Sequence, residues 1–512
     1  MGSKTVAILG GGPAGLTAAY QILKTSPDTK VIVFESANIL GGISATVSFN
    51  GNRMDLGGHR FFTKSQEVSD IWFELLNKQS EPAKDGQTPS NYSTIGIPGD
   101  PDGDPETSDL VMLERQRVSR IYYKGKFFDY PVKLNARLFA ALGLGGTLKV
   151  GFGYLATLFK KLPEDSLENF YINRFGRPLY KMFFETYTEK LWGIHPSKLD
   201  ASWGAQRVKG LSILGVLKEA LFKPKVKETT LIDRFLYPKL GPGQLWEVMA
   251  EKIVAMGGEI KLATNVVGLT PLKDGGWEVL ALSGDDTERV TVDDVFSSAP
   301  VRDLVRMLPS VPAEVRHASD SLNYRDMQVC GILLNKLGIV NKKSPDKLIP
   351  DCWIYIQDRN VTAGRIQILN NWSPYLVASD DKHWVSLEYF CTAGDDMWRM
   401  SDDDFYALVR DDAIKLGMID SDTQCEFHRV RVSGAYPVYD EAYSHFDIVK
   451  QYLNSLDGLY CIGRNGQHRY NNLDHSMLTA CEAVRVWSGI GDKEIIWAVN
   501  TDSEYHEEKS QE

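Results

Sequence analysis

The chain has 512 residues, of which 43% are hydrophobic and 24% charged, and its formal net charge is −10. This length exceeds what one hydrophobic core ordinarily serves, so we expect two or more domains. The negative net charge gives no general attraction to nucleic acid or to anionic membranes. An anionic substrate would therefore have to be met by local arginine and lysine side chains.

The cysteines and the N-terminus bear on the cellular compartment. Six cysteines occur singly, without a CxxC pair, so neither a zinc site nor a redox dithiol is predicted. The sequence runs from Met1 and Lys4 into the apolar segment VAIL without a cleavable signal peptide. Together these features predict a cytoplasmic location and no metal site.

The chain opens with the pattern of a doubly wound sheet. Residues 5–36 predict a strand, a glycine turn, a helix and a second strand. Residues 78–110 are rich in Pro, Gly, Asp and Ser, which predicts a long, mobile surface insertion. Residues 135–225 are predicted to be helical. Within them, residues 138–159 are about long enough to span a bilayer, but five glycines and Lys149 favour buried helices of a substrate lobe over membrane insertion.

Short strands return in the second half of the chain. Residues 257–300 predict strands that complete the first sheet, and residues 320–440 predict a second sheet. The predicted fold class is α/β, with a Rossmann-like domain, an inserted helical lobe and a second, antiparallel β-sheet domain for the substrate. The predicted domains are a discontinuous nucleotide-binding domain (1–75, 235–310 and 455–495), an insertion with a mainly helical lobe (76–234), a β-sheet substrate domain (311–454) and a disordered tail (496–512).

The glycine-rich turn near the N-terminus predicts a diphosphate site. Gly10 permits the tight turn, Gly12 lets a diphosphate approach the backbone, and Gly15 lets the helix pack on the strand. The diphosphate would meet free amides and the positive end of the helix. Glu35, 20 residues beyond Gly15, is placed to accept hydrogen bonds from ribose hydroxyls. An acidic residue at this position argues against NADP.

Further turns favour FAD over the shorter NAD. The segments LGGISAT (40–46) and MDLGGHRFF (54–62) add two more small-residue turns. Near the C-terminus, GRNGQHRYNNLDHSML (463–478) places polar residues at a helix start, where amides and the helix dipole could stabilise negative charge on a flavin. Three glycine turns and a closing helix suit an extended FAD.

Four longer blocks carry a family resemblance: ESANILGGISAT, LGGHRFF, LWGIHPSKLDASWGAQRV (191–208) and GRNGQHRYNNLDHSMLTACEAV (463–484). The chain resembles the FAD-containing superfamily of amine oxidases and protoporphyrinogen oxidases, and within it the eukaryotic-type UDP-galactopyranose mutases. The similarity spans most of residues 5–490. The cofactor-binding residues predicted from the turns and the resemblance are Gly10, Gly12, Pro13, Ala14, Gly15, Glu35, Ser36, Gly41, Gly42, Ile43, Ser44, Gly57, Gly58, His59, Val266, Gly463, Arg464, Asn472, Asp474, His475 and Ser476.

The resemblance implies a particular chemistry. A reduced flavin would attack the anomeric carbon of a nucleotide sugar through N5, expel the nucleoside diphosphate and hold the sugar while its ring reopens and closes smaller. The substrate would be a small molecule, and NAD(P)H would reduce the flavin. Neither nucleic acid nor stable membrane insertion is expected, and an oligomer is left open.

The resemblance also implies residues that act on the substrate. They are His59 in a turn beside the flavin ring, Arg207 at the diphosphate, and Tyr436, Tyr470 and Asn472 at the phosphates or the sugar. Each has an ordinary alternative, because arginines are often solvated, a histidine can complete a turn, and tyrosines are often half-buried packing residues.

Two positions depart from the mutase pattern. The position of a second diphosphate-binding arginine is Asn335, and the glutamine expected after a Tyr-Pro pair is Lys133. A neutral amide cannot offset the charge of a diphosphate or offer a guanidinium fork. Lys133, Arg359 or Arg365 could supply the missing cation.

Three functions stay open from the sequence. The first is a flavin-dependent isomerase that acts on a nucleotide sugar. The second is an FAD oxidoreductase that takes a hydride from a C–N or C–C unit and passes electrons to oxygen or another acceptor. The third is a non-catalytic flavin-binding protein. Basic residues in the pocket favour the first function, and a mainly aromatic, apolar pocket favours the second.

Overall fold

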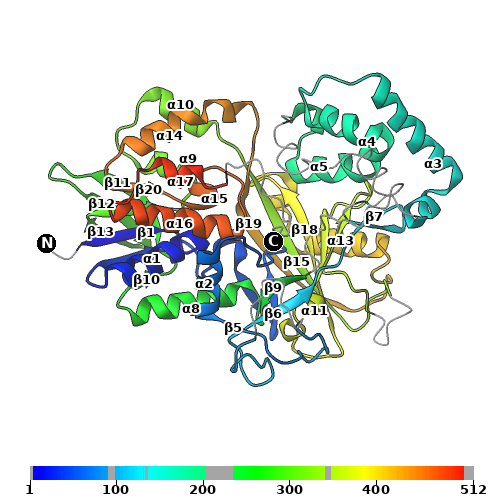
Figure 1. Ribbon diagram of the computed structural model, residues 1–512, viewed down its shortest axis with the longest axis horizontal. Helices are drawn as coiled ribbons and strands as arrows, with labels where there is room; N and C mark the ends of the chain where they lie inside the picture. Colours follow the sequence, from blue (N-terminus) through cyan, green and yellow to red (C-terminus); the bar gives the residue numbers. More distant parts are fainter. Residues whose placement is uncertain are drawn as a thin grey trace. The chain divides into compact units, whose positions relative to one another are not determined.

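The computed structural model describes residues 4–89, 99–130, 132, 136–199, 201, 234–340 and 348–500. Its contacts divide the chain into two compact units, whose elements Figure 1 colours along the sequence. Where they are described, residues up to 114, 236–324 and those from 434 belong to the first unit. Residues 115–235 and 325–433 belong to the second unit.

The first unit is built on a parallel sheet that starts at the N-terminus. β1 (Thr5–Leu9) leads through a glycine turn into α1 (Pro13–Thr25), and β2 (Lys30–Phe34) then pairs in parallel with β1. Pro13 suits the first helical position, where its missing N–H has no intrahelical partner. The sheet order is β10-β2-β1-β14-β20, with β10 (Glu259–Lys261), β14 (Asp294–Ser297) and β20 (Leu459–Cys461). The predicted strand, turn, helix and strand are confirmed.

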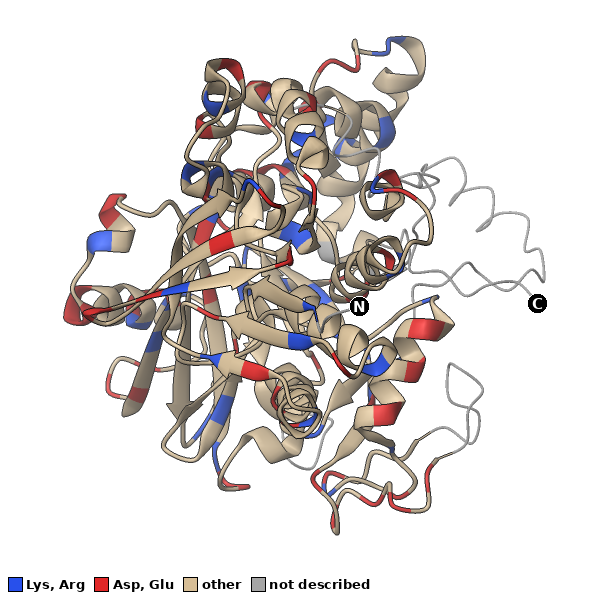
Figure 2. Ribbon diagram, turned by 90° about the vertical axis from the view of Figure 1, so that its left-hand side faces the viewer, with Lys and Arg blue, Asp and Glu red and all other residues tan. Residues whose placement is uncertain are grey.

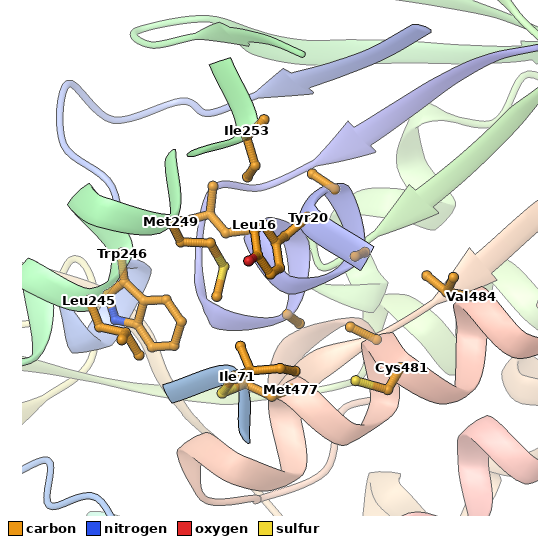
Figure 3. Close-up of a cluster of buried hydrophobic side chains, with 14 of the residues drawn as sticks. Leu16, Tyr20, Ile71, Leu245, Trp246, Met249, Ile253, Met477, Cys481 and Val484 are labelled. Carbon is orange, nitrogen blue, oxygen red and sulfur yellow. The ribbon is translucent and has the colours of Figure 1, made fainter. Parts of the chain in front are cut away.

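The two faces of this sheet carry separate cores, because successive side chains of a strand point to opposite faces. Val6 and Ile8 join a core with α1, α2 (Gln66–Leu75), α8 (Pro242–Ala255) and α16 (Leu473–Trp487). Figure 3 shows Leu16 and Tyr20 of α1 within this core, between side chains of α8 and α16. The core on the other face is formed with β11 (Asn265–Pro271), β12 (Trp277–Ser283), β13 (Asp286–Val292), α9 (Val301–Met307), α10 (Ala313–Asp320) and α14 (Phe446–Ser455).

The described part of the predicted insertion folds back on its own start. Lys78 N donates to the Asp100 carboxylate at 2.7 Å, and Ser80 N donates to the Gly103 carbonyl at 2.9 Å. Residues 90–98 lie outside the described residues. Further short elements along the chain are η1 (Gly42–Ser44), β3 (Thr46–Phe49), β4 (Asn52–Asp55), β5 (Asn77–Lys78), β6 (Val111–Gln116), β9 (Arg234–Pro238), η4 (Glu441–His445) and α15 (Gly463–Gly466).

The second unit is built on a seven-stranded sheet. Its order is β19-β15-β18-β17-β16-β7-β8, and its described pairs are antiparallel except for β16 and β7, which run parallel. The strands are β7 (Ser119–Tyr123), β8 (Lys126–Asp129), β15 (Tyr324–Leu334), β16 (Trp353–Ile356), β17 (Arg365–Ile368), β18 (His383–Cys391) and β19 (Cys425–Pro437). The helices are α3 (Ala136–Phe159), α4 (Leu167–Phe183), α5 (Glu185–Trp192), η2 (Pro196–Lys198), α11 (Leu369–Trp372), η3 (Pro374–Leu376), α12 (Asp396–Arg399) and α13 (Asp402–Lys415).

The domain boundaries differ from the predicted ones. The contacts group the predicted helical lobe with the second sheet, because α3 and α4 share a core with β7 and β8. Residues 76–114 and 434–454 belong to the first unit instead. The predicted tail starts too early, because Glu494–Ala498 form α17, where Trp497 is buried and its Nε1 donates to Asn454 at 2.6 Å. Residues 501–512 lie outside the structure's described ranges.

The prediction of buried helices over residues 138–159 is wrong. Within the described ranges, one helix is long and apolar enough to cross a membrane by length and composition, and only 17% of its window Leu142–Phe159 is buried. Gly143, with φ 67°, interrupts α3 near its start. Among the described residues, the helix after this break packs against α4.

Candidate cofactor site

Two glycines of the first turn are required by the protein itself. A Cβ at Gly10 (φ 105°) would lie 2.3 Å from the Ser298 hydroxyl, and a Cβ at Gly15 would lie 1.9 Å from the Gly10 carbonyl oxygen. Both distances are far below van der Waals contact. Gly15 therefore lets α1 start close against the turn, as the motif predicts. Ser298, directly after β14, is a neighbour of this turn that sequence reasoning missed.

Gly12 differs, because neither its conformation nor the surrounding protein requires a glycine. Its backbone is extended (φ −85°), and a Cβ there would lie no closer than 3.8 Å to its nearest neighbour, the Gly42 backbone of the second turn. Gly42 in turn faces the Gly12 backbone. The space between the two turns is thus lined by backbone at the N-terminus of α1. Such a space fits a diphosphate that accepts from amide N–H groups.

Glu35 joins the first turn to the end of β2. Its carboxylate accepts from Gly11 N at 2.6 Å and from Ala37 N at 2.8 Å, and the side chain is buried. The Glu35 carbonyl accepts from Thr264 N at 2.8 Å, two residues before the buried Val266. A carboxylate has about four acceptor positions, so Glu35 keeps capacity for ribose hydroxyls.

A buried polar cluster holds the second turn, and sequence reasoning missed it. Asp55 is fully buried, and its carboxyl group contacts the Tyr237 hydroxyl and the Thr46 hydroxyl, the latter at 2.9 Å. The Thr46 hydroxyl also accepts from Gly243 N at 2.9 Å, in the first turn of α8. Burial raises the pKa of Asp55 to about 7, against the hydrogen bonds from Tyr237 and Thr46. The only sequence signal was an acidic residue within the block MDLGGHRFF.

The other predicted residues of the turns are placed as follows. Gly41 has φ 103°, and its carbonyl accepts from the Ser44 hydroxyl at 2.8 Å. In the third turn Gly57 has φ 128°, and the half-buried His59 places Nδ1 3.0 Å from the Gly57 carbonyl. Ile43 is half-buried and Gly58 is exposed.

The C-terminal block packs its helix start against the start of α1. A Cβ at Gly463 (φ 73°) would lie 2.8 Å from the Ala14 Cβ. At the start of α16, Asn472 N donates to His475 Nδ1 at 3.1 Å. Burial lowers the pKa of His475, with Asp474 acting in the opposite direction, and an accepting Nδ1 requires the unprotonated nitrogen. Ser476 closes the turn through its hydroxyl, which donates to the Asn471 side chain at 2.9 Å.

Arg464 contacts the rings of two tyrosines that the family resemblance implies to bind the substrate. Its guanidinium donates to the Ala435 carbonyl at 2.9 Å and to the Asn471 carbonyl at 2.6 Å. Its Cζ lies 5.7 Å from the Tyr436 ring centroid and 4.8 Å from that of Tyr470. The two rings are parallel within 7°, with centroids 6.1 Å apart. Within the first unit, Tyr436, Arg464, Tyr470 and the helix start at Asn472 therefore come together.

The residues predicted to supply positive charge either lie outside the described residues or are paired with acidic side chains. Arg207 and Lys133 lie outside the described residues. Asn335 follows β15 in the second unit, and its side-chain oxygen accepts from the Lys382 ammonium, a nearby cation that sequence reasoning missed. Two other candidates are already engaged: Arg359 donates to Glu185 and Glu189 at 2.9 and 2.8 Å, and Arg365 pairs with the buried Glu388. No cluster of His, Cys, Asp or Glu suited to a metal ion occurs among the residues the structure describes.

Comparison with known proteins places this chain in a family. A family model described as flavin containing amine oxidoreductase matches residues 13–472. The chain belongs to this family. Membership confirms the superfamily predicted from the sequence blocks and supports a flavin cofactor.

Solved structures share the fold of this chain. A crystal structure of a reduced UDP-galactopyranose mutase has a TM-score of 0.76 at 19% identity, covering 98% of this chain and 99% of that chain. A structure described as a putative protoporphyrinogen oxidase from Exiguobacterium sp. 255-15 has a TM-score of 0.66 at 17% identity, covering 95% of this chain and all of that chain. The predicted α/β fold class is confirmed.

Curated relatives of the chain carry oxidase names. Protoporphyrinogen oxidase 1 of Arabidopsis thaliana, described as chloroplastic, is 23% identical over 349 residues, which cover 65% of this chain and 59% of that protein. The coproporphyrinogen III oxidase of Mycobacterium leprae is 34% identical over 94 residues, which cover 18% of this chain and 21% of that protein. The chain thus spans less than two thirds of the length of these relatives.

Proposed function

We propose that the chain is an FAD-dependent mutase that interconverts the pyranose and furanose forms of a nucleotide sugar. One observation carries the proposal. Tyr436, Arg464, Tyr470 and Asn472 come from two separate segments of the mutase-like pattern and come together in the first unit. Phenol hydroxyls, an amide and a helix start suit the oxygens of a sugar diphosphate, whereas an oxidase site for an apolar substrate would be mainly apolar.

FAD fits the turns described above. Gly12 and Gly42 leave room for its diphosphate, Glu35 would accept from its ribose, and the start of α16 would face its flavin end. In its reduced form FAD supplies a nucleophilic nitrogen that can displace a nucleoside diphosphate from a sugar. The protein then has to bind and orient the diphosphate while it leaves.

Arg464 acts as a positioning residue in this proposal. Its guanidinium is bonded to two backbone carbonyls, so it fixes the segments that carry Tyr436 and Tyr470. The tyrosine hydroxyls would then donate to the diphosphate oxygens. Such bonds gain strength when the acceptor is charged. His475, held neutral by burial, accepts from the Asn472 backbone and keeps the helix start in shape.

Product analysis tests the proposal. Protein purified with its flavin is reduced anaerobically with dithionite and incubated with UDP-galactopyranose, and the nucleotide sugars are separated by anion-exchange chromatography. We expect a furanose isomer with reduced protein and none with oxidised protein. Tyr470→Phe should slow its formation, whereas Tyr452→Phe, which alters a hydroxyl bonded to the Ser310 carbonyl, should not. Absence of isomer from any nucleotide sugar offered to the reduced, flavin-replete protein would overturn the proposal.

A second candidate function is a flavin oxidase of the porphyrinogen type. The names of the curated relatives favour it. This candidate predicts that the oxidised protein reduces oxygen to peroxide when a porphyrinogen is supplied. It also predicts that Tyr436→Phe and Tyr470→Phe together leave this activity largely intact, because no charged leaving group has to be held.

A further inference from the structure

The helix of α3 after Gly143 presents an apolar stripe to solvent. Five of its large side chains are exposed at positions that follow one another by four, four, three and four residues, which places them on one face. Leu144 is 80% exposed, Phe152 70% and Phe159 90%, with Leu148 and Leu155 about half exposed between them. Soluble proteins rarely expose contiguous apolar patches of this kind without a partner. We call these five side chains the α3 stripe.

The opposite face of the same helix is already packed. Val150 and Thr157 are buried, and a Cβ at Gly153 would lie 2.3 Å from Pro178 of α4. The close contact of Gly153 with α4 fixes the orientation of the helix about its axis. Rotation of the helix therefore cannot bury the α3 stripe. Figure 1 shows α3 beside α4.

Positive charge accompanies the stripe. Lys149 and Lys160 are both exposed and lie eleven positions apart, which places them on the same flank of the stripe. Lys161, two residues beyond the end of the helix, is also exposed. The segment 136–163 contains no Asp or Glu, and residues 136–199 contain nine basic and five acidic residues in a chain whose net charge is −10. Figure 2 shows both basic and acidic residues spread over the ribbon of the chain.

The geometry points to an anionic lipid surface as the occupant of this face. We propose that the α3 stripe docks on an anionic membrane, with its apolar side chains among the acyl chains and its lysines at the lipid headgroups. Lysines beside an apolar helix face bury their stems and keep their charge at the headgroups. The net charge of the whole chain predicts no attraction to anionic membranes, but this local surface carries lysines without acidic residues in the same segment.

Two other arrangements fit less well. Residues 144–159 span about 24 Å as a helix, less than the roughly 30 Å of a bilayer core, and packing on α4 keeps one side of the helix off lipid. The helix therefore lies in the membrane surface and does not cross it. A second copy docked through the same stripe would meet lysines or apolar groups, because segment 136–163 offers no acid to pair with Lys149 or Lys160.

Vesicle flotation with the full, flavin-loaded chain tests the proposal. We expect the protein to float with phosphatidylcholine vesicles that contain phosphatidylserine, not with phosphatidylcholine alone, and to be released by salt. Leu148→Ser with Phe152→Ser should lower the partition coefficient about tenfold or more. A matched control is Val254→Ser with Ile490→Ser, two exposed apolar residues of the first unit, which should not change it.

Charge variants test the second half of the proposal. Lys149→Gln, Lys160→Gln and Lys161→Gln together should lower binding to the anionic vesicles about tenfold to a hundredfold. The control changes three other exposed lysines, Lys30→Gln, Lys252→Gln and Lys273→Gln, and should have little effect. Flavin absorbance and melting temperature identify any variant that fails to fold. Three results would overturn the proposal: no flotation of wild type, flotation that the stripe variants leave unchanged, or a dimer that Phe152→Ser dissociates without any vesicle binding.

Discussion

Gly12 and Gly15 belong to one glycine motif, yet the structure predicts opposite consequences for them. At Gly12 a Cβ would lie 3.8 Å from its nearest neighbours and the backbone is extended, so alanine is compatible with the folded protein. Such a glycine-to-alanine change stabilises a protein by about 0.4–1 kcal/mol by restricting the unfolded chain. At Gly15 the same Cβ would lie 1.9 Å from a backbone oxygen. Overpacking of this kind costs about 1–3 kcal/mol.

For FAD binding we expect the opposite order, in which the change at Gly12 is the more harmful one. If the space beside Gly12 holds a diphosphate, a methyl group there overpacks the bound state by about 1–3 kcal/mol, which weakens FAD binding about 5- to 150-fold. Gly12→Val should abolish binding. Gly15→Ala should instead lower the melting temperature of both the flavin-free and the flavin-loaded protein.

The assay measures flavin content after purification, the FAD dissociation constant by flavin fluorescence, and the melting temperature of the protein freed of flavin. Gly145→Ala, at an exposed position of α3 with no neighbour within 4 Å, is the control and should leave FAD binding unchanged. The reasoning is refuted if Gly12→Ala binds FAD as tightly as wild type, or if it melts lower than wild type without flavin.

Three further predictions concern charge. Because burial raises the pKa of Asp55 to about 7, wild type should lose stability as pH rises from about 4 through 7, and Asp55→Asn, which stays neutral, should remove this loss when melting temperature is followed against pH. Arg207→Ala should weaken nucleoside diphosphate binding about tenfold to a hundredfold with unchanged FAD content, and Arg207→Lys should recover only part of it in the same titration. Arg464→Lys should weaken that binding and lower the melting temperature, because one ammonium cannot bond both the Ala435 and Asn471 carbonyls as the guanidinium does; equal affinity would contradict the positioning role.

The local part of the cofactor site could be predicted because its signals are local. A strand, three spaced glycines, a helix and an acid at the next strand end follow one another within residues 5–36, and backbone geometry alone dictates that order. The close approach of Gly463 to Ala14 joins distant parts of the chain and was not predicted from the sequence. The predicted roles of Tyr436 and Tyr470 rest on resemblance and stay predictions.

The remaining features depend on contacts between distant residues. Asp55 meets Tyr237 across 182 positions, and nothing near either residue announces the pair. Trp497, near the end of α17 and within the predicted disordered tail, is buried in the core that contains Phe446. The apolar run of α3 predicted burial because an apolar segment is usually internal, and only the packing on α4 shows which face is covered.

The ratio of product to electrons consumed tests the proposed mutase function most directly. Flavin-loaded protein is reduced once under anaerobic conditions, supplied with excess nucleotide sugar, and followed by chromatography for the sugar isomer and by absorbance for the flavin. The proposal predicts many molecules of isomer for each reduced flavin, with the flavin still reduced at the end. No isomer under these conditions, with a product that forms only after air is admitted and in step with peroxide formation, would contradict it and identify an oxidoreductase.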